Sequence, residues 1–281
     1  MDNSAGMSLA KREESDYNTI LIFADGESME EKKTTFMYKI ILALVKLFYP
    51  PMETVGLENL PDEPAVIVGN HTQMNGPIAC ETRLPVNRYT WCAGEMMAWK
   101  EVPAYAYRDF WSQKPRAVRW FYKILSYLIT PLAVCLFNNA RTIPVYHDTR
   151  VLTTFRTTVN HLQEGSSIVI FPEHNVKFNH ILYDFQDRFI DLGRMYYRKT
   201  GKALAFVPLY IAPKLRKMVL GKPIRFRPEA PLAEERQRIC DYLKAEITSM
   251  ADALPLHTVI PYRNIPKRLY PTNHPQGETP S

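Results

Sequence analysis

The sequence places a histidine directly after an apolar strand. The run Ala65–Gly69 (AVIVG) predicts a buried β-strand, and Asn70 and His71 follow it. Active sites of α/β sheets form where strands end, and an imidazole there can act as a general base near neutral pH. A lone histidine at a strand end is more often structural, so this interpretation needs support from other segments.

A second apolar strand, Ser167–Phe171, ends in groups of complementary chemistry. Pro172 and Glu173 follow it, and His174 and Lys177 come shortly after, so one strand end supplies a carboxylate, an imidazole and a cation. Polar groups at two strand ends of one sheet should converge. We therefore expect His71 and Glu173 to lie in one cleft.

Basic residues follow a third strand, Ala203–Ile211, and suit an anionic ligand. They form a basic rim that consists of Lys214, Arg216, Lys217 and Lys222. Arg141 adds a cation at the start of another strand. The rim could bind a phosphate, but solvated surface charge is the commoner explanation for any one member. The spacing of His174 and His180 matches no standard metal-ligand pattern, so we expect no metal.

These segments need a sheet to position them, and the remaining pattern indicates one. Apolar strands alternate with helical segments, which predicts an α/β fold with a mixed, mostly parallel sheet flanked by helices. The other expected strands are Tyr89–Ala93, Thr142–Tyr146 and Met218–Phe226. The expected helices are Pro77–Leu84, Thr149–Gln163, Phe189–Lys199 and Leu232–Ala253.

Taken in order, four segments resemble the motif blocks of the glycerolipid (lysophosphatidate) acyltransferase family. That family carries Asn-His-x4-Asp, a block ending in Ile-Phe/Pro-Val, then Phe-Pro-Glu-Gly, then Val-Pro-Val/Ile. The corresponding segments here are Asn70-His71, Thr142–Val145, Phe171-Pro172-Glu173 and Val207-Pro208-Leu209. The resemblance extends from about the start of an N-terminal apolar helix to the last expected helix, and the order of the blocks is more specific than any single block.

The resemblance implies a reaction and a set of site residues. His71 would remove a proton from a hydroxyl of lysophosphatidate or a related lysophospholipid, which then attacks an acyl thioester. The co-substrate would be acyl-CoA or acyl carrier protein, with no further cofactor. The expected catalytic residues are His71, Asn75 and Glu173, and the expected substrate-binding residues are Asn70, Arg141, Phe171, Pro172, His174 and Lys177.

One departure from the family bears directly on catalysis. Gly76 stands at the position of the family's aspartate, which orients the histidine. We expect the amide oxygen of Asn75 to accept the Nδ1 proton instead, and Gly76→Asp to keep or raise activity. Asn75-Gly76-Pro77 can equally be a turn before a helix. The alternative function is therefore a catalytically silent relative that binds lipid or a protein partner.

Composition excludes several other classes. The chain has 281 residues, 46% hydrophobic and 23% charged, and its mean hydropathy of −0.25 argues against a polytopic membrane protein. A net charge of +6 favours anionic partners, but the sequence contains no recognisable nucleic-acid-binding motif. Four scattered cysteines suggest neither a zinc ribbon nor a disulfide framework, and the absence of G-x-S-x-G argues against a serine hydrolase.

The chain divides into four parts. Residues 1–33 read as a polar arm without a secretory signal, and residues 34–50 as an apolar helix ended by two prolines. At ~1.5 Å per residue that helix is short for a bilayer, so we expect peripheral, cytoplasmic-side association with membrane lipids, or else a buried core helix. Residues 51–255 form the main domain and residues 256–281 a surface tail.

A second apolar stretch, Trp120–Phe137, leaves two interpretations open. Basic residues precede it at Lys114, Arg116 and Arg119, and these could meet lipid phosphates. Pro131 interrupts it, so it can equally be two ordinary helices packed on the sheet.

Overall fold

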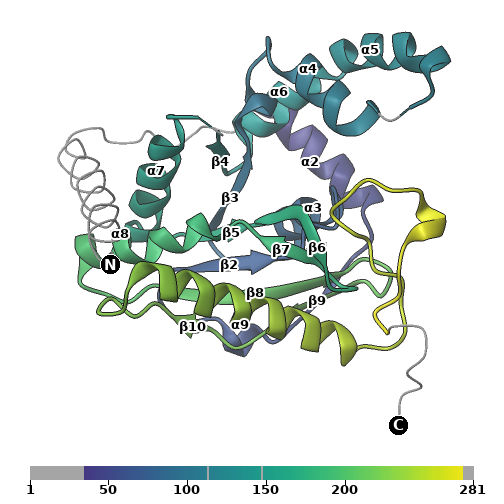
Figure 1. The fold of residues 1–281 in the computed structure, drawn as a ribbon. Coiled ribbons are helices and arrows are strands. Elements are labelled where there is room, and N and C mark those ends of the chain that lie inside the picture. Colours follow the sequence, from purple (N-terminus) through teal and green to yellow (C-terminus); the bar gives the residue numbers. More distant parts are fainter. Residues whose placement is uncertain (1–34, 113, 147, 275–281) are drawn as a thin grey trace, which may run out of the picture.

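An eight-stranded sheet forms the centre of the molecule (Figure 1). The computed structural model describes residues 35–112, 114–146 and 148–274. The strand order is β1-β9-β8-β2-β5-β3-β4, with β10 paired to β8. The strands are β1 (Glu53–Val55), β2 (Ala65–Gly69), β3 (Arg88–Ala93), β4 (Thr142–Val145), β5 (Ser167–Ile170), β8 (Ala205–Ala212), β9 (Lys217–Leu220) and β10 (Ile224–Arg225).

Most of the strand pairs in this sheet are parallel. β2 pairs in parallel with β5 and β8, and β3 pairs in parallel with β4 and β5. Only β9 and β10 run antiparallel to their neighbour β8. The expected fold class, a mixed and mostly parallel α/β sheet flanked by helices, is confirmed.

Helices cover both faces of the sheet, which explains the unbroken apolar run of β2. Val66 and Val68 face a core shared with α7 (Val151–Gln163), α8 (Asp191–Thr200) and α9 (Leu232–Asp252). Ala65 and Ile67 face a second core that includes α3 (Asn75–Arg83). Alternate residues of a strand point to opposite faces, so a strand buried on both sides must be apolar throughout.

The structure differs from the predicted elements in two places. The expected strand Met218–Phe226 is broken into β9 and β10 by Gly221-Lys222-Pro223, where the proline cannot donate a ladder hydrogen bond. The segment after Phe171 forms a hairpin of β6 (Glu173–Phe178) and β7 (Tyr183–Phe185), which the sequence pattern did not predict. The hairpin was missed because β6 carries mostly polar, exposed side chains.

The N-terminal apolar segment is a helix, α2 (Phe36–Phe48), capped by the Thr35 side chain. Tyr38 is its buried residue, and the Tyr38 hydroxyl donates to Glu81 of α3 at 2.9 Å. α2 therefore attaches to the body by one side. The polar arm expected over residues 1–33 lies outside the described residues.

The second apolar stretch forms α5 (Arg119–Leu128) and α6 (Thr130–Asn139), with α4 (Val102–Ala106) beside them. Figure 1 shows these helices projecting from one end of the sheet. In the part of the chain that is described, no single helix is long and apolar enough to cross a membrane. The segments Arg116–Leu128 and Thr130–Asn139, bent by 43° relative to each other, are together long and apolar enough by length and composition.

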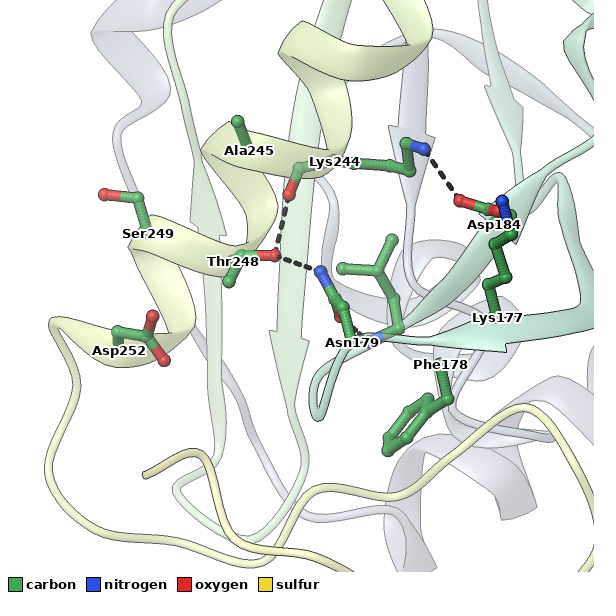
Figure 2. Close-up of a pocket in the computed structure, with 10 residues that line it drawn as sticks. Lys177, Phe178, Asn179, Asp184, Lys244, Ala245, Thr248, Ser249 and Asp252 are labelled. Atoms are coloured by element: carbon green, nitrogen blue, oxygen red, sulfur yellow. Dashed lines mark hydrogen bonds and ion pairs between the residues drawn. The ribbon is translucent and has the colours of Figure 1, made fainter. Parts of the chain in front are cut away.

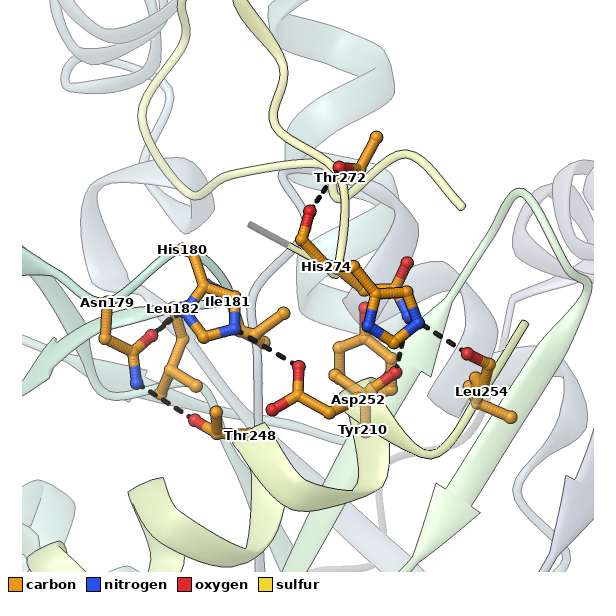
Figure 3. Close-up of polar contacts among 12 residues, drawn as sticks. Asn179, His180, Ile181, Leu182, Tyr210, Thr248, Asp252, Leu254, Thr272 and His274 are labelled. Atoms are coloured by element: carbon orange, nitrogen blue, oxygen red, sulfur yellow. Dashed lines mark hydrogen bonds and ion pairs between the residues drawn. The ribbon is translucent and has the colours of Figure 1, made fainter. Parts of the chain in front are cut away.

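The C-terminal segment is packed onto the body as far as His274. We expected a surface tail over residues 256–281, but His257, Val259 and Asn273 are buried. His257 Nε2 lies 2.8 Å from the Tyr210 hydroxyl, and the Asn273 amide donates to the Ala251 carbonyl at 2.8 Å. Figure 3 shows this segment beside α9, next to the ion pair of His180 with Asp252.

Candidate active site

His71 lies at the carboxyl end of β2 between two aromatic rings. The centroid of its ring is 5.4 Å from that of Phe171 and 5.3 Å from that of Tyr262, both in edge contact. Phe171 follows β5, whereas Tyr262 comes from the C-terminal segment. The imidazole is therefore held by packing on two sides.

Glu173 lies against the backbone of His71. Its Oε1 accepts a hydrogen bond from the His71 backbone N–H at 2.7 Å, and its Oε2 accepts one from the Tyr183 backbone N–H at 2.8 Å. The two strand ends thus converge, as residues that end neighbouring parallel strands should. The carboxylate ties the end of β2 to the β6–β7 hairpin and does not contact the imidazole ring by a hydrogen bond.

Burial keeps the imidazole neutral. It lowers the pKa of His71 to about 4, although the carbonyls of Gln73 and His71 itself oppose the shift by favouring the protonated ring. Nδ1 is enclosed and has no hydrogen-bond partner among the described residues. At pH 7 the ring is an uncharged proton acceptor whose orientation no hydrogen bond to Nδ1 fixes.

Burial has the opposite effect on Glu173. It raises the pKa of that carboxyl to about 7, while the N–H groups of Tyr183 and His71 act to lower the pKa. Glu173 is 4% exposed, so its negative charge is costly unless both donors remain in place.

The hydrogen bond expected from His71 to Asn75 is not formed. The Asn75 side-chain amide donates to the Thr72 carbonyl at 3.1 Å and so closes the turn that begins α3. This corrects the expectation that Asn75 orients the imidazole, and the turn interpretation of Asn75 describes the structure.

Gly76 is enclosed by the site itself. A Cβ at this position would lie 2.5 Å from the His71 carbonyl oxygen, 3.0 Å from Phe171 Cε1 and 3.2 Å from the Asn70 carbonyl oxygen. The first of these is a backbone atom and cannot move aside cheaply. The loop therefore lacks room for an aspartate at position 76, which corrects the expectation that Gly76→Asp rebuilds the site.

The loop after His71 holds an unusual backbone. Thr72 and Gln73 have φ of 44° and 56°, a left-handed conformation that is rare for a β-branched threonine. Such strain concentrates at functional sites. The Gln73 side chain donates to the Tyr270 hydroxyl at 3.0 Å, which links this loop to the C-terminal segment.

Asn70, expected to bind substrate, is part of the sheet. Its side-chain amide donates to the Ile211 carbonyl at 3.1 Å and accepts from the Ile211 N–H at 2.7 Å. The side chain is buried. Because both of its polar atoms are engaged by β8, Asn70 positions the end of β2 and is not free for a ligand.

Arg141, also expected to bind substrate, lies at the end of the sheet where the parallel strands begin, opposite the end that carries His71. Arg141 precedes β4, whereas His71 follows the carboxyl end of β2. β4 pairs in parallel with β3, β3 with β5, and β5 with β2, so all four strands run in the same direction. The Arg141 guanidinium donates to Asn87, which precedes β3. Because Arg141 begins a parallel strand and His71 follows the end of one, the structure places the two residues at opposite ends of the sheet.

The other expected substrate-binding residues are divided between two places. Phe171 contacts His71, and Pro172 beside it is buried and accepts a hydrogen bond from the Gln186 N–H at 2.9 Å. His174 is half-buried in β6. Lys177 is exposed and lines a hollow of about 510 Å³ between the hairpin and α9, where Lys244 pairs with Asp184 at 2.7 Å (Figure 2). His71 and Glu173 do not line that hollow.

Part of the basic rim lies at the same end of the sheet as His71, where the parallel strands finish. Lys214 and Arg216 are exposed in the turn after β8, and β8 is parallel to β2. Lys217 pairs with Glu53 at 3.4 Å, and Lys222 lies beyond the far end of β9. Two cations of the rim are therefore exposed at the end of the sheet that carries His71.

Tyr262 is a site residue that the sequence pattern did not indicate. Burial raises the pKa of its hydroxyl, and the nearby carboxylates of Asp109 and Glu173 raise it further. Nothing in the Pro-rich stretch around it suggests a return to the sheet.

Within the described ranges, no three His, Cys, Asp or Glu side chains gather so as to hold a metal ion.

No protein-family model and no curated protein matches the sequence. Among solved structures, the chain is similar to the crystal structure of the 1-acyl-sn-glycerophosphate (LPA) acyltransferase, PlsC, from Thermotoga maritima. The two are 15% identical over 85% of this chain and 89% of that chain, with a TM-score of 0.44. A likeness this distant establishes neither family nor function.

Proposed function

We propose that this protein transfers a fatty acyl group from an acyl thioester to a hydroxyl of lysophosphatidate or a related lysophospholipid. The observation that supports this best is the hydrogen bond of 2.7 Å between the His71 N–H and Glu173. It joins the Asn-His and Phe-Pro-Glu segments at the edge of a parallel sheet where active sites form.

In the proposed reaction His71 is the general base. Nδ1 is enclosed, so Nε2 takes the proton of the acceptor hydroxyl as its oxygen attacks the thioester carbonyl. The carbon–sulfur bond then breaks, and the imidazolium returns the proton to the departing thiolate. The products are an ester and a free thiol, and the histidine ends neutral as it began.

Three neighbours prepare His71 for this role without touching the reacting atoms. Glu173 fixes the backbone of His71, and the rings of Phe171 and Tyr262 restrict its side chain. A neutral base that is already oriented loses less entropy in the transition state. Lys214 and Arg216 are the proposed partners of the acceptor's phosphate because they are exposed cations at the same edge.

The donor would be acyl-CoA or acyl carrier protein, and the acceptor would reside in a bilayer. We therefore propose that the chain works in phospholipid biosynthesis while peripherally associated with the cytoplasmic side of a membrane. The exposed apolar residues of α2 support such an association.

A catalytically silent relative that binds lipid or a protein partner is the second candidate. Two observations favour it: Nδ1 of His71 has no partner in the described part of the chain, and Gly76 leaves no space for an orienting carboxylate. In a serine protease, loss of the correct imidazole tautomer costs ~10⁴ in rate.

Purified full-length protein, assayed with acyl-CoA and acyl carrier protein donors against lysophosphatidate and lysophospholipids, decides between the two. Thiol release and the new ester, measured by mass spectrometry, must rise together, since thiol release alone reports hydrolysis. Ester formation with at least one pair supports the enzyme. If binding of the acceptor is measurable but no pair gives an ester, the silent relative replaces it.

A further inference from the structure

α5 turns its apolar side away from the protein. Its large exposed apolar residues recur at i, i+1, i+4, i+7 and i+8, so they share one stripe on the helix. They are Trp120 (65% exposed), Phe121 (52%), Ile124 (51%), Tyr127 (69%) and Leu128 (69%). We call this set the α5 stripe.

The side of α5 that faces the protein is the less apolar one. Ser126 is buried there and its hydroxyl donates to the Lys123 carbonyl at 2.7 Å, with Tyr122 and Leu125 half-buried nearby. An amphipathic helix in a water-soluble domain packs its apolar stripe inward. This orientation is the reverse, and it leaves a continuous apolar surface that needs a partner.

α2 repeats the arrangement. Tyr38, 4% exposed, faces the body, while the α2 stripe faces outward at i, i+1, i+4, i+8, i+11 and i+12. The α2 stripe consists of Phe36 (79% exposed), Met37 (58%), Ile40 (41%), Leu44 (50%), Leu47 (75%) and Phe48 (80%).

The two helices belong to the same end of the molecule. Both contact α6, and the Thr35 N–H at the start of α2 donates to Asn139 at the end of α6, at 3.1 Å. Figure 1 shows α2, α5 and α6 gathered beyond the sheet.

Cations without acidic partners border both stripes. They are Lys39 and Lys46 on α2, and Lys114, Arg116, Arg119 and Lys123 on or before α5. None of these six forms an ion pair with an acid among the described residues. The sequence has no Asp or Glu between Phe110 and His147, nor between Lys32 and Met52. An apolar stripe bordered only by cations is complementary to anionic lipid.

We propose that the α2 and α5 stripes together bind the interface of an anionic bilayer. Each helix lies in the headgroup region with its stripe in the acyl boundary, because α5 alone spans only ~15 Å, half of a hydrocarbon core, and α6, which would complete a bent span with it, is packed against α2, α4 and β4. The α5 stripe thus adds a second contact to the association proposed for α2. Two membrane contacts on one body raise the overall affinity for the bilayer above that of either contact alone. This binding needs no chemistry at His71.

Co-sedimentation of the full-length protein with vesicles tests the inference. One set contains phosphatidylcholine alone, and the other also contains phosphatidylglycerol. The variants are Leu128→Glu on the α5 stripe and Leu47→Glu on the α2 stripe. The matched control is Leu256→Glu, a residue 67% exposed outside both stripes, against 69% for Leu128. Light scattering records the oligomeric state of each.

We expect binding that is stronger on the anionic vesicles and weaker in high salt. Leu128→Glu and Leu47→Glu should each weaken it by about tenfold, since each loses more than ~1.4 kcal/mol of apolar transfer. Leu256→Glu should bind as the wild type. Emission of Trp120, identified by its loss in Trp120→Phe, should shift to the blue on binding.

Three results would overturn the inference. The first is vesicle binding that Leu128→Glu leaves at the wild-type level while Leu47→Glu abolishes it, because α2 would then act alone. The second is a dimer that Leu128→Glu dissociates, which would make the α5 stripe a protein interface. The third is absence of binding in the full chain but not after removal of residues 1–34, which would make that segment the occupant.

Discussion

Replacing Gly76 by alanine should destabilise the protein, against the usual effect of this change in a helix. Gly76 lies in the first turn of α3, and Gly→Ala in a helix normally stabilises by up to ~1 kcal/mol. Here the new Cβ would lie 2.5 Å from the His71 carbonyl oxygen and 3.0 Å from Phe171 Cε1. Overpacking of this kind costs ~1–3 kcal/mol, which outweighs the gain from helix propensity.

After the helix-propensity gain is subtracted, the net cost is up to ~2 kcal/mol, so the melting temperature of Gly76→Ala should fall by up to roughly 8 °C, at about 2–4 °C per kcal/mol for a domain of this size. The melting temperature of Gly76→Asp should fall further, because this substitution also buries a carboxylate. Calorimetry measures both, with Gly201→Ala as the comparison: no atom of the described residues lies within 4 Å of its Cβ, and its cost comes from a φ of +69°. A Gly76→Ala protein that melts at or above the wild type would refute the reasoning, because the loop would then have room for an orienting carboxylate.

Three further predictions concern the neighbours and the titration of His71. Glu173→Gln should lower the free energy of unfolding by about 1–3 kcal/mol, because one amide oxygen cannot accept from both the His71 and Tyr183 N–H groups; unchanged denaturant unfolding would contradict this. Tyr262→Ala should lower kcat/KM about two- to tenfold while Tyr262→Phe keeps it, since the observed contact with His71 is between the two rings; equal losses would instead implicate the hydroxyl. The pKa of folded His71 is lowered to about 4, so between pH 6.5 and 4 this residue binds more protons in the unfolded chain and its contribution to the free energy of unfolding falls as the pH drops. Glu173, whose pKa is raised to about 7, contributes in the opposite direction in the wild type and in His71→Gln alike. The free energy of unfolding of the wild type minus that of His71→Gln should therefore fall as the pH drops through this window; parallel curves for the two proteins would be the contrary result.

The framework of the site could be predicted because it depends on patterns along single strands. The unbroken apolar runs of β2 and β5 require burial on both faces, and parallel strands bring their carboxyl ends to one edge. That is sufficient to bring His71 and Glu173 together. It does not determine which atoms meet, and the Glu173 carboxylate bonds to the His71 backbone and not to its ring.

The parts that failed depend on direction and on distant contacts. Arg141 was assigned to the site although it begins a strand, which places it at the opposite edge. The left-handed backbone of Thr72 and Gln73 follows no residue preference, so the sequence gives no sign of it. Tyr262 lies in a segment that His257 and Asn273 anchor on β8 and α9, and such isolated anchors leave no periodic signal.

Acyl transfer by the wild type and by His71→Ala is the most direct test of the proposed role of His71. Both proteins are incubated at pH 7 with the donor and lysophosphatidate, and the new ester is quantified by mass spectrometry, with melting curves to show that both are folded. The wild type should form the ester, and His71→Ala should form it ~10²–10⁴-fold more slowly, the usual loss on removing a general base. Ester formation at equal rates by the two folded proteins would contradict the assignment of His71 as the base.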